Sequence, residues 1–288
     1  MSKNSHPIKS IVARIGTDKP VRKTPYQVKG VIMRDFQDEP IVPLIDGSYR
    51  ERFLYPRVQV KILNEQIYFV GIKEGVEPIQ SVAQKIKIMN FGNITFEVDG
   101  VDVEVVDNRF SPASRLIRYT FLTPWIALND TNLGKYRYMY GDERVKFLGR
   151  LLSQNIVFLA KEMGLDLNTK IYSRLNLDTL NPKMVDDGQM GAFQGEFRTN
   201  FVLPNFLGVG NGITKGYGAL FSQFNPADFS FDESKLKRSS SRKNSVEDMP
   251  EDWEKEALAP DDIPRSRRVR RPNKEPNYNS LEYHKRTH

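Results

Sequence analysis

The sequence predicts an α+β protein made of two similar units in succession. Stretches in which apolar and polar residues alternate, as in half-buried strands, are interleaved with stretches whose apolar residues recur every three or four positions, as in amphipathic helices. The predicted order is β-α-β-β-α-β plus one strand in the first unit, and β-α-β-β, a loop and a strand in the second. This order is typical of ferredoxin-like, or RRM-like, domains, so we expect two of them in tandem.

The first unit, residues 10–110, follows a flexible leader at residues 1–9. A helix is expected at 25–36, because Thr24 can cap its N-terminus and Pro25 suits its first position. The other predicted elements are a strand at 10–15, strands at 53–62 and 66–72, a helix at about 77–89, and a hairpin of strands 94–98 and 101–106 that turns at Asp99-Gly100.

The second unit, residues 111–229, contains the longest predicted helix, at about 143–163. Its apolar residues form one continuous stripe, Asp142 is placed to cap its N-terminus, and Gly164 is placed to end it. The other predicted elements are a strand at 115–127, a connector at 129–141, strands at 170–177 and 192–203, a glycine-rich loop at 206–218 and a final strand at 217–221.

The composition changes at about residue 230. A Lys/Arg/Ser stretch at 235–245 is followed by an acidic stretch at 247–262 and an Arg-rich stretch at 265–274, and aromatic residues become rare. Few apolar side chains are then available to offset the entropy of ordering the chain. We therefore expect residues 230–288 to form a disordered, charged tail.

The sequence indicates a cytoplasmic protein that does not associate with a membrane. No run of 18 or more apolar residues is present, and residues 1–9 lack the apolar core of a secretory signal. The 288-residue chain also has no cysteine, which excludes disulfides, thiolate metal sites and cysteine nucleophiles.

All three histidines, His6, His284 and His288, lie in the expected leader or tail. A histidine metal site or a serine–histidine triad is therefore not expected in the folded body. The adjacent carboxylates Asp186-Asp187 precede a glycine and are explained by a turn. We expect no metal and no other cofactor. The net charge of +7 favours a polyanionic partner.

Residues 206–218 hold five of the nineteen glycines of the chain. Glycine lets the backbone approach a ligand closely, and the N–H groups of such a run, beside Thr214 and Lys215, can bind phosphate oxygens. A glycine-rich hairpin loop without a ligand is the alternative, and the loop by itself does not decide between the two.

Two stretches resemble a known superfamily. Gly208, Gly210, Gly216 and Gly218 match a C-terminal motif of the form Gly-x-Gly-x-x-x-x-x-Gly-aromatic-Gly. The stretch 119–125 is similar to the aromatic-rich strand that opens the second domain of the same proteins. These are the RAMP (repeat-associated mysterious) proteins of CRISPR systems, and among them the "Cas six" type endoribonuclease, which cuts precursor CRISPR RNA. The resemblance covers both units and not the tail.

The resemblance implies metal-independent cleavage of one phosphodiester in the repeat RNA. The 2′-hydroxyl attacks the adjacent phosphorus and leaves a cyclic phosphate, so a general base, a general acid and cations around the phosphorane are needed. It also implies CRISPR repeat RNA as the partner, CRISPR effector proteins as further partners, and a role in antiviral defence.

Many members of this family use a histidine near the first helix as the base, and the body of this chain has none. The predicted catalytic residues follow the first helix: Tyr49, Arg52 and Tyr55. A tyrosine with a lowered pKa, or a lysine, can take the proton, and arginine can stabilise the phosphorane. Solvated arginines and a packed Tyr55 are the alternative. Other cations and tyrosines lie in the same stretch or on the helix before it: Arg50, Arg57, Lys23, Tyr26 and Lys29.

RNA-binding residues are expected in three places. Arg144 and Lys146 lie in the first turn of the long helix, where cations oppose the helix dipole and an anionic partner would explain them. Lys135 and Tyr136 begin an alternation of cations and aromatics that suits stacking on unpaired bases. Solvated charges and a packed surface loop are the alternatives. The glycine loop supplies the remaining predicted RNA-binding residues: Gly208, Gly210, Gly212, Thr214, Lys215, Gly216 and Gly218.

An endoribonuclease that matures CRISPR RNA is the favoured function at this level. The alternative is a non-catalytic, RNA-binding RAMP subunit of a CRISPR effector complex. An RRM-like protein unrelated to CRISPR is disfavoured, because the Lys/Arg-Gly-Phe/Tyr-Gly/Ala-Phe pattern of such proteins is missing.

Overall fold

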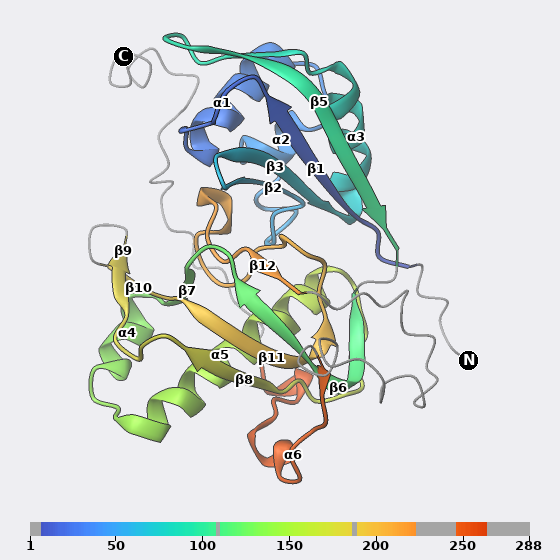
Figure 1. Cartoon of the computed structure of the whole chain (residues 1–288). Coiled ribbons are helices and arrows are strands. Elements are labelled where there is room, and N and C mark those ends of the chain that lie inside the picture. The colour runs from blue at the N-terminus through green and yellow to red at the C-terminus, as the bar shows by residue number, and fades with distance from the viewer. Residues whose placement is uncertain (1–6, 108–109, 186–188, 223–245, 264–288) are drawn as a thin grey trace, which may run out of the picture.

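The computed structural model describes residues 7–107, 110–185, 189–222 and 246–263. These residues form two α+β units stacked one above the other (Figure 1). The predicted fold class, with two ferredoxin-like units in tandem, is confirmed. Within the described ranges, no helix is long and apolar enough to cross a membrane.

The first unit is built on a five-stranded antiparallel sheet with the strand order β2-β3-β1-β5-β4. Thr24 caps α1 as expected, in a capping box with Gln27. The elements are β1 (Ser10–Thr17), α1 (Pro25–Asp35), α2 (Val42–Ile45), β2 (Val58–Leu63), β3 (Gln66–Ile72), the 3₁₀ turn η1 (Lys73–Gly75), α3 (Val76–Lys85), β4 (Ile88–Asn90) and β5 (Thr95–Val106).

The two faces of this sheet belong to different cores. Ile67 and Phe69 of β3 pack with the helices of the first unit. Val70 and Ile72 of the same strand pack with the second unit, because successive side chains of a strand point to opposite faces. The aromatic ring of Tyr68 likewise stacks on Phe206 of the second unit, with 5.1 Å between ring centroids. The units therefore share a continuous apolar interface.

The predicted hairpin at Asp99-Gly100 is wrong, because β5 runs without a break from Thr95 to Val106. Gly100 lies opposite Gly16 of β1, and the register shifts between Gly16 and Thr17. The glycine pair accommodates this bulge inside a continuous strand. The actual hairpin joins β4 to β5. The predicted strand at 53–62 also starts later, at Val58.

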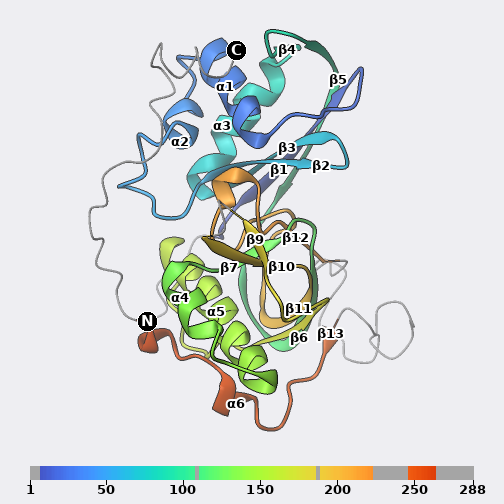
Figure 2. The same ribbon diagram turned by 90° about the vertical axis from the view of Figure 1, so that its left-hand side faces the viewer.

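The second unit contains a five-stranded sheet, with the order β12-β6-β11-β8 and with β13 (Val246–Glu247) also paired to β6, and a three-stranded sheet, β7-β10-β9. The long helix α5 packs beside them, with α4 at its N-terminal side (Figure 2). The elements are β6 (Ser111–Phe121), β7 (Trp125–Leu128), α4 (Asp130–Tyr136), α5 (Gly141–Glu162), β8 (Ser173–Leu177), β9 (Lys183–Val185), β10 (Met190–Phe193), β11 (Gly195–Val202), the 3₁₀ turn η2 (Ile213–Lys215) and β12 (Leu220–Phe221).

Two predicted strands of the second unit are each divided between the two sheets. The strand expected at 115–127 forms β6 and β7, which are separated by Leu122 to Pro124. The strand expected at 192–203 forms β10 and β11, and the chain turns at Gly195, whose φ is 135°. The expected N-cap also differs, because Tyr140 precedes α5 and Asp142 lies in its first turn.

The prediction of a disordered tail is wrong for residues 246–263, which we call the strap. Its first strand, β13 (Val246–Glu247), pairs with β6, and a short helix, α6 (Trp253–Glu256), follows. Leu258 is 2% exposed and bridges to Ile171, after which the 3₁₀ turn η5 (Pro260–Asp262) follows. Leu258 provides the apolar anchor that the charged composition concealed. The rest of the predicted tail, and residues 1–6 of the leader, lie outside the described residues.

Candidate functional site

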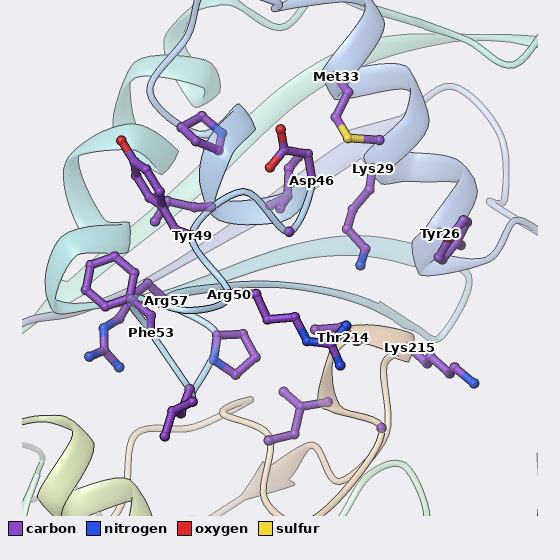
Figure 3. Close-up of a pocket in the computed structure, with 18 of the residues that line it drawn as sticks. Tyr26, Lys29, Met33, Asp46, Tyr49, Arg50, Phe53, Arg57, Thr214 and Lys215 are labelled. Carbon is purple, nitrogen blue, oxygen red and sulfur yellow. The ribbon is translucent and has the colours of Figure 1, made fainter. Parts of the chain in front are cut away.

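A cleft of about 550 Å³ opens between the two units (Figure 3). One wall comes from α1 and from the segment that joins α2 to β2. The other wall is the middle of the glycine loop. The lining residues are Tyr26, Lys29 and Met33 of α1, Pro43 to Ile45 of α2, Asp46, Gly47, Tyr49, Arg50, Phe53, Leu54, Pro56 and Arg57 of the joining segment, and Gly210 to Lys215 of the loop.

The cleft is basic. Lys29, Arg50, Arg57 and Lys215 line it, and Asp46 is the one carboxylate among the lining residues. The carboxylate of Asp46 accepts hydrogen bonds from the backbone N–H and the hydroxyl of Ser48 at 2.7 and 2.8 Å. A concave surface with an excess of cations concentrates positive potential and favours an anionic ligand.

Lys29 and Arg50 both extend into the cleft from the first unit (Figure 3). Lys29 descends from α1 and is 8% exposed, with its Nζ 5.5 Å from the centroid of the Tyr26 ring. Arg50 extends from the joining segment toward Thr214 and Lys215 of the glycine loop. Lys215 of the glycine loop lines the same cleft, so both units contribute cations to one site, which neither unit could form alone.

Arg57 has a structural role instead. It is 4% exposed, pairs with Glu74 at 2.8 Å and donates to the carbonyl oxygen of Glu162 at 2.9 Å. The Glu162 carboxylate accepts from the backbone N–H groups of Leu54 and Tyr55. These bonds fix the end of the joining segment to the C-terminus of α5.

Tyr49 is the predicted catalytic residue that the structure places in the cleft. Its ring is 38% exposed and packs edge-on against Phe53, with 6.0 Å between centroids. Arg52 does not line the cleft. Its guanidinium lies 5.5 Å from the Tyr49 ring and 5.1 Å from the Phe53 ring, so it packs against the aromatic pair.

Tyr55 cannot act as the base, which corrects the prediction. It is 2% exposed, its hydroxyl donates to the carbonyl of Gly208 at 2.7 Å, and the side-chain amide of Gln59 donates to the hydroxyl at 2.8 Å. Burial raises the pKa of the Tyr55 phenol well above its usual range. Tyr55 instead joins the two units through its hydrogen bond to Gly208.

The glycine loop is held by the protein over much of its length. The N–H of Gly208 donates to Gln59 at 2.8 Å, that of Gly218 to Pro124 at 2.9 Å, and that of Gly216 to Ile213 at 3.1 Å. These three glycines do not line the cleft, so the prediction that they cradle phosphate is wrong. Gly210, Gly212, Thr214 and Lys215 do line it.

Close packing explains the glycines better than a ligand does. A Cβ on Gly218, whose φ is 68°, would lie 2.0 Å from the carbonyl oxygen of Val209. One on Gly210, with φ 87°, would lie 2.6 Å from the Trp125 ring. Both the backbone conformation and the space therefore exclude a side chain. An alanine substitution at these positions would disturb the fold and would not report on RNA contact alone.

Lys61 lies beneath the loop, a position that sequence analysis missed. The alternation of Lys61 with Val60 and Ile62 is typical of a strand with one solvent-exposed face. Lys61 is nevertheless 0% exposed and donates to the carbonyls of Tyr217 at 3.0 Å and Ile213 at 3.4 Å. Burial, with a smaller contribution from nearby Lys29, lowers the pKa of Lys61 to about 7. No sequence signal marked that face of β2 as an interface.

Three of the four predicted RNA-binding residues on α4 and α5 contact other parts of the protein: Tyr136, Arg144 and Lys146. Tyr136 is 1% exposed and its hydroxyl donates to Leu180, so it cannot stack on a base, which corrects the prediction. Arg144 donates to Met139 at 2.7 Å and lies 4.7 Å from the Tyr136 ring. Lys146 pairs with Glu256 of the strap at 3.5 Å. Lys135 is exposed.

The accessible aromatics of the connector are Tyr138 and Tyr140, which are 83% and 76% exposed. The alternation of cations and aromatics thus presents different tyrosines from the one predicted. Across the described part of the chain, no group of three or more His, Cys, Asp or Glu side chains is arranged to hold a metal ion.

Comparison with known families places the chain among CRISPR-associated proteins with two domains. The Cas6b N-terminal domain family matches residues 6–108, and the Cas6b C-terminal domain family matches residues 111–223. The chain belongs to the Cas6b family.

Individual relatives agree with this assignment. The solved structure titled "Crystal structure of Cas6b" is 26% identical, with a TM-score of 0.63, and the match covers 75% of this chain and 99% of that one. A second solved structure, titled "Crystal structure of CRISPR RNA processing endoribonuclease Cas6b", is 24% identical with a TM-score of 0.54. This match covers 74% of this chain and 99% of that one, and it supports the fold. An uncharacterized protein of Methanocaldococcus jannaschii is 30% identical over 136 residues, which is 47% of this chain and 92% of that protein.

The packing of the glycine loop generates a stability prediction. Gly218→Ala introduces both a strained φ and a clash with the Val209 carbonyl, so the protein should lose about 2 kcal/mol or more of folding free energy. Gly134→Ala is the matched control, because the helical Gly134 has no atom within 4 Å of its added Cβ. It should gain up to about 1 kcal/mol. Thermal unfolding measures both, and equal melting temperatures would contradict the packing account.

Lys61 generates a pH prediction. Its folded pKa of about 7 lies below its unfolded value, so the unfolded chain binds more protons between the two. The free energy of unfolding should therefore rise from about pH 7 to pH 10, by at most about 1.4 kcal/mol per pH unit. Lys61→Met should remove this rise. Urea unfolding at pH 7, 8 and 9 tests it, and parallel pH profiles for the two proteins would show that Lys61 is charged in the folded state.

Proposed function

We propose that this protein is a CRISPR RNA-processing endoribonuclease whose active site is the basic cleft between the two units. The supporting observation is that Tyr49, Lys29 and Arg50 of the first unit and Lys215 of the second all line this one cleft. Membership of the Cas6b family, one of whose solved structures is titled as a CRISPR RNA processing endoribonuclease, supports this role. We place the activity in the cytoplasm and in antiviral defence.

The reaction we propose is metal-independent. The 2′-hydroxyl of the nucleotide before the cut attacks the adjacent phosphorus, a P–O bond to the 5′-oxygen breaks, and a cyclic phosphate and a 5′-hydroxyl result. The 2′-hydroxyl proton must be accepted and the leaving oxygen must be protonated. The oxygens of the phosphorane carry additional negative charge that nearby cations stabilise.

The cleft provides residues for each of these roles. The Tyr49 phenol is a hydrogen-bond donor at the edge of the cleft and can protonate the leaving oxygen. In its neutral, unprotonated form the Lys29 amine is the group that we assign to the 2′-hydroxyl proton, since it points into the cleft from α1. The guanidinium of Arg50 can bind two phosphorane oxygens at once, and Lys215 can hold a neighbouring phosphate.

Tyr49→Phe tests the proton-transfer role with the smallest change of shape. It should reduce the rate of single-turnover cleavage of repeat RNA by about 100-fold or more, because positioned acid–base groups contribute at least that much. RNA affinity should change less than threefold. Tyr138→Phe is the control, since Tyr138 is an exposed tyrosine of the other unit, and it should cleave normally. A Tyr49→Phe rate within threefold of the unchanged protein would exclude the phenol.

The same assay tests the chemistry when it is run in EDTA. Cleavage should persist without divalent metal, and a 2′-deoxy substitution at the cut site should abolish it. Analysis of the 5′ fragment should find a cyclic phosphate end. Cleavage of the 2′-deoxy substrate would overturn the proposed mechanism.

A specific observation favours one alternative function. The three histidines lie outside the described residues, so the described cleft has no imidazole. A non-catalytic RNA-binding subunit of a CRISPR effector complex would need only the cations. Tight binding of repeat RNA without any product after long incubation would establish this alternative.

A further inference from the structure

Three arginines form a row across the outer face of the β12-β6-β11-β8 sheet of the second unit. Arg198 of β11 lies directly opposite Arg118 of β6 on one side and Arg174 of β8 on the other. We call these three residues the arginine row. Adjacent strands are about 4.8 Å apart, so the row is about 10 Å long. Like charges in directly opposite positions destabilise a sheet, so this arrangement requires anions.

Two carboxylates meet the row, from different parts of the chain. Glu196 belongs to the sheet and binds Arg118 through both carboxylate oxygens, which lowers the pKa of Glu196. Glu247 belongs to the strap and lies 2.9 Å from Arg198 and 3.4 Å from Arg174. Without the strap, Arg198 and Arg174 would lose their shared carboxylate and would face solvent.

The strap repeats this charge complementarity along its length. Asp248 pairs with Arg115 at 2.8 Å, and Glu256 pairs with Lys146 at 3.5 Å. The acidic side chains of the strap thus lie on cations of the second unit. The strap also lies C-terminal to residues 111–223, the region that matches the Cas6b C-terminal domain. The cations belong to that domain, whereas the carboxylates are an addition to it.

The attachment of the strap is suited to release. Asp248 is 80% exposed, Glu247 is 43% exposed and Glu256 is 48% exposed. Exposed ion pairs are individually weak and are screened by salt. Backbone pairing comes from β13, which is two residues long, and from Leu258, while Leu258 and the partly buried Ile263 supply the apolar contacts of the described strap. Lys161 also donates to the carbonyl of Pro260 at 2.5 Å.

We propose that the arginine row is a binding site for the phosphates of an RNA strand and that the strap is its intramolecular competitor. Arginine guanidinium groups bind phosphate oxygens bidentately, as Arg118 binds the Glu196 carboxylate. RNA binding to the row and strap binding then exclude each other, so each weakens the other by the same factor. The inference rests on the proposed function only in taking RNA as the ligand, and it does not require cleavage.

The first test uses the unchanged full-length protein. A fluorescein-labelled 20-nucleotide oligouridylate is added to saturation, and backbone hydrogen exchange is followed by mass spectrometry. Exchange across residues 246–258 should accelerate at least threefold, because RNA displaces the strap. Unchanged exchange in these residues at saturation would overturn the proposal.

The second test uses substitutions in the full-length protein. Glu247→Gln should tighten oligouridylate binding about three- to tenfold at about 100 mM salt, whereas Glu254→Gln should change it less than twofold. Glu254 is the matched control, since it is an exposed carboxylate of the strap with no ion pair within the described residues. Equal affinities for the two variants would contradict the competition.

Salt dependence identifies the row as the site. Arg174→Ala, placed in the Glu247→Gln protein, should cancel the gain and reduce the slope of log affinity against log salt by about 0.7, the value for one phosphate contact on single-stranded RNA. Lys87→Ala, an exposed cation of the first unit, should leave the slope unchanged. A retained gain after Arg174→Ala would exclude the row. The binding of oligouridylate does not require cleavage. A negative result in these binding tests would therefore leave the proposed cleavage of repeat RNA untouched, and the two proposals can fail separately.

Discussion

A closed set of hydrogen bonds joins the glycine loop to the first unit. The Tyr55 hydroxyl donates to the carbonyl of Gly208, the Gln59 amide donates to that hydroxyl, and the Gln59 carbonyl oxygen accepts from the N–H of Gly208. All three residues are buried, so each bond forms where an unmade one would carry a desolvation cost. The cleft exists because this contact holds the loop against β2, with its 210–215 segment opposite α1.

The glycines of the loop serve this contact. Four of them, Gly210, Gly212, Gly216 and Gly218, have positive φ values. Because none carries a Cβ, the chain can pass close to Trp125, Val209 and the β2 side chains. The packing of the glycine loop is therefore required for ligand binding, because Thr214 and Lys215 line the cleft with Lys29 and Arg50 only when the loop is held against β2. The interface and the site depend on the same residues. The glycine motif, which resembles a phosphate-binding loop, therefore mainly fixes the two units against each other.

The order of most elements followed from the sequence, because alternation and helical periodicity are local properties, whereas the predicted hairpin at Asp99-Gly100 was wrong. The pattern did not show where a strand changes sheet, since Trp125 keeps the phase of Phe121, and Phe197 keeps the phase of Phe193, on the far side of each break. It could not show that Gln59 and Lys61 are buried, because a polar strand face looks solvent-exposed until a second unit covers it. The strap was missed for a related reason. Leu258, Ile263 and several ion pairs hold it, and the average composition of the segment hides these individual contacts.

The site was predicted in part. Tyr49, Thr214 and Lys215 come from stretches far apart in sequence and meet in one cleft. The predictions for Tyr55 and Tyr136 were wrong, because the residues next to a tyrosine in the sequence do not show whether its side chain is buried or accessible. Lys29 stood in the wider set of candidates, and only the geometry of α1 singles it out. Tertiary contacts, which no local pattern encodes, decided each of these cases.

Photo-crosslinking of repeat RNA tests most directly whether the cleft holds the scissile phosphate. The RNA carries a 2′-deoxy substitution at the cut site, so that it stays intact, and a 5-iodouridine beside it. Mass spectrometry of the products should locate the cross-links within residues 26–33, 46–57 or 210–215, the segments that line the cleft. Cross-links confined to other segments, with a protein that still cuts the unmodified RNA, would contradict the placement of the active site between the two units.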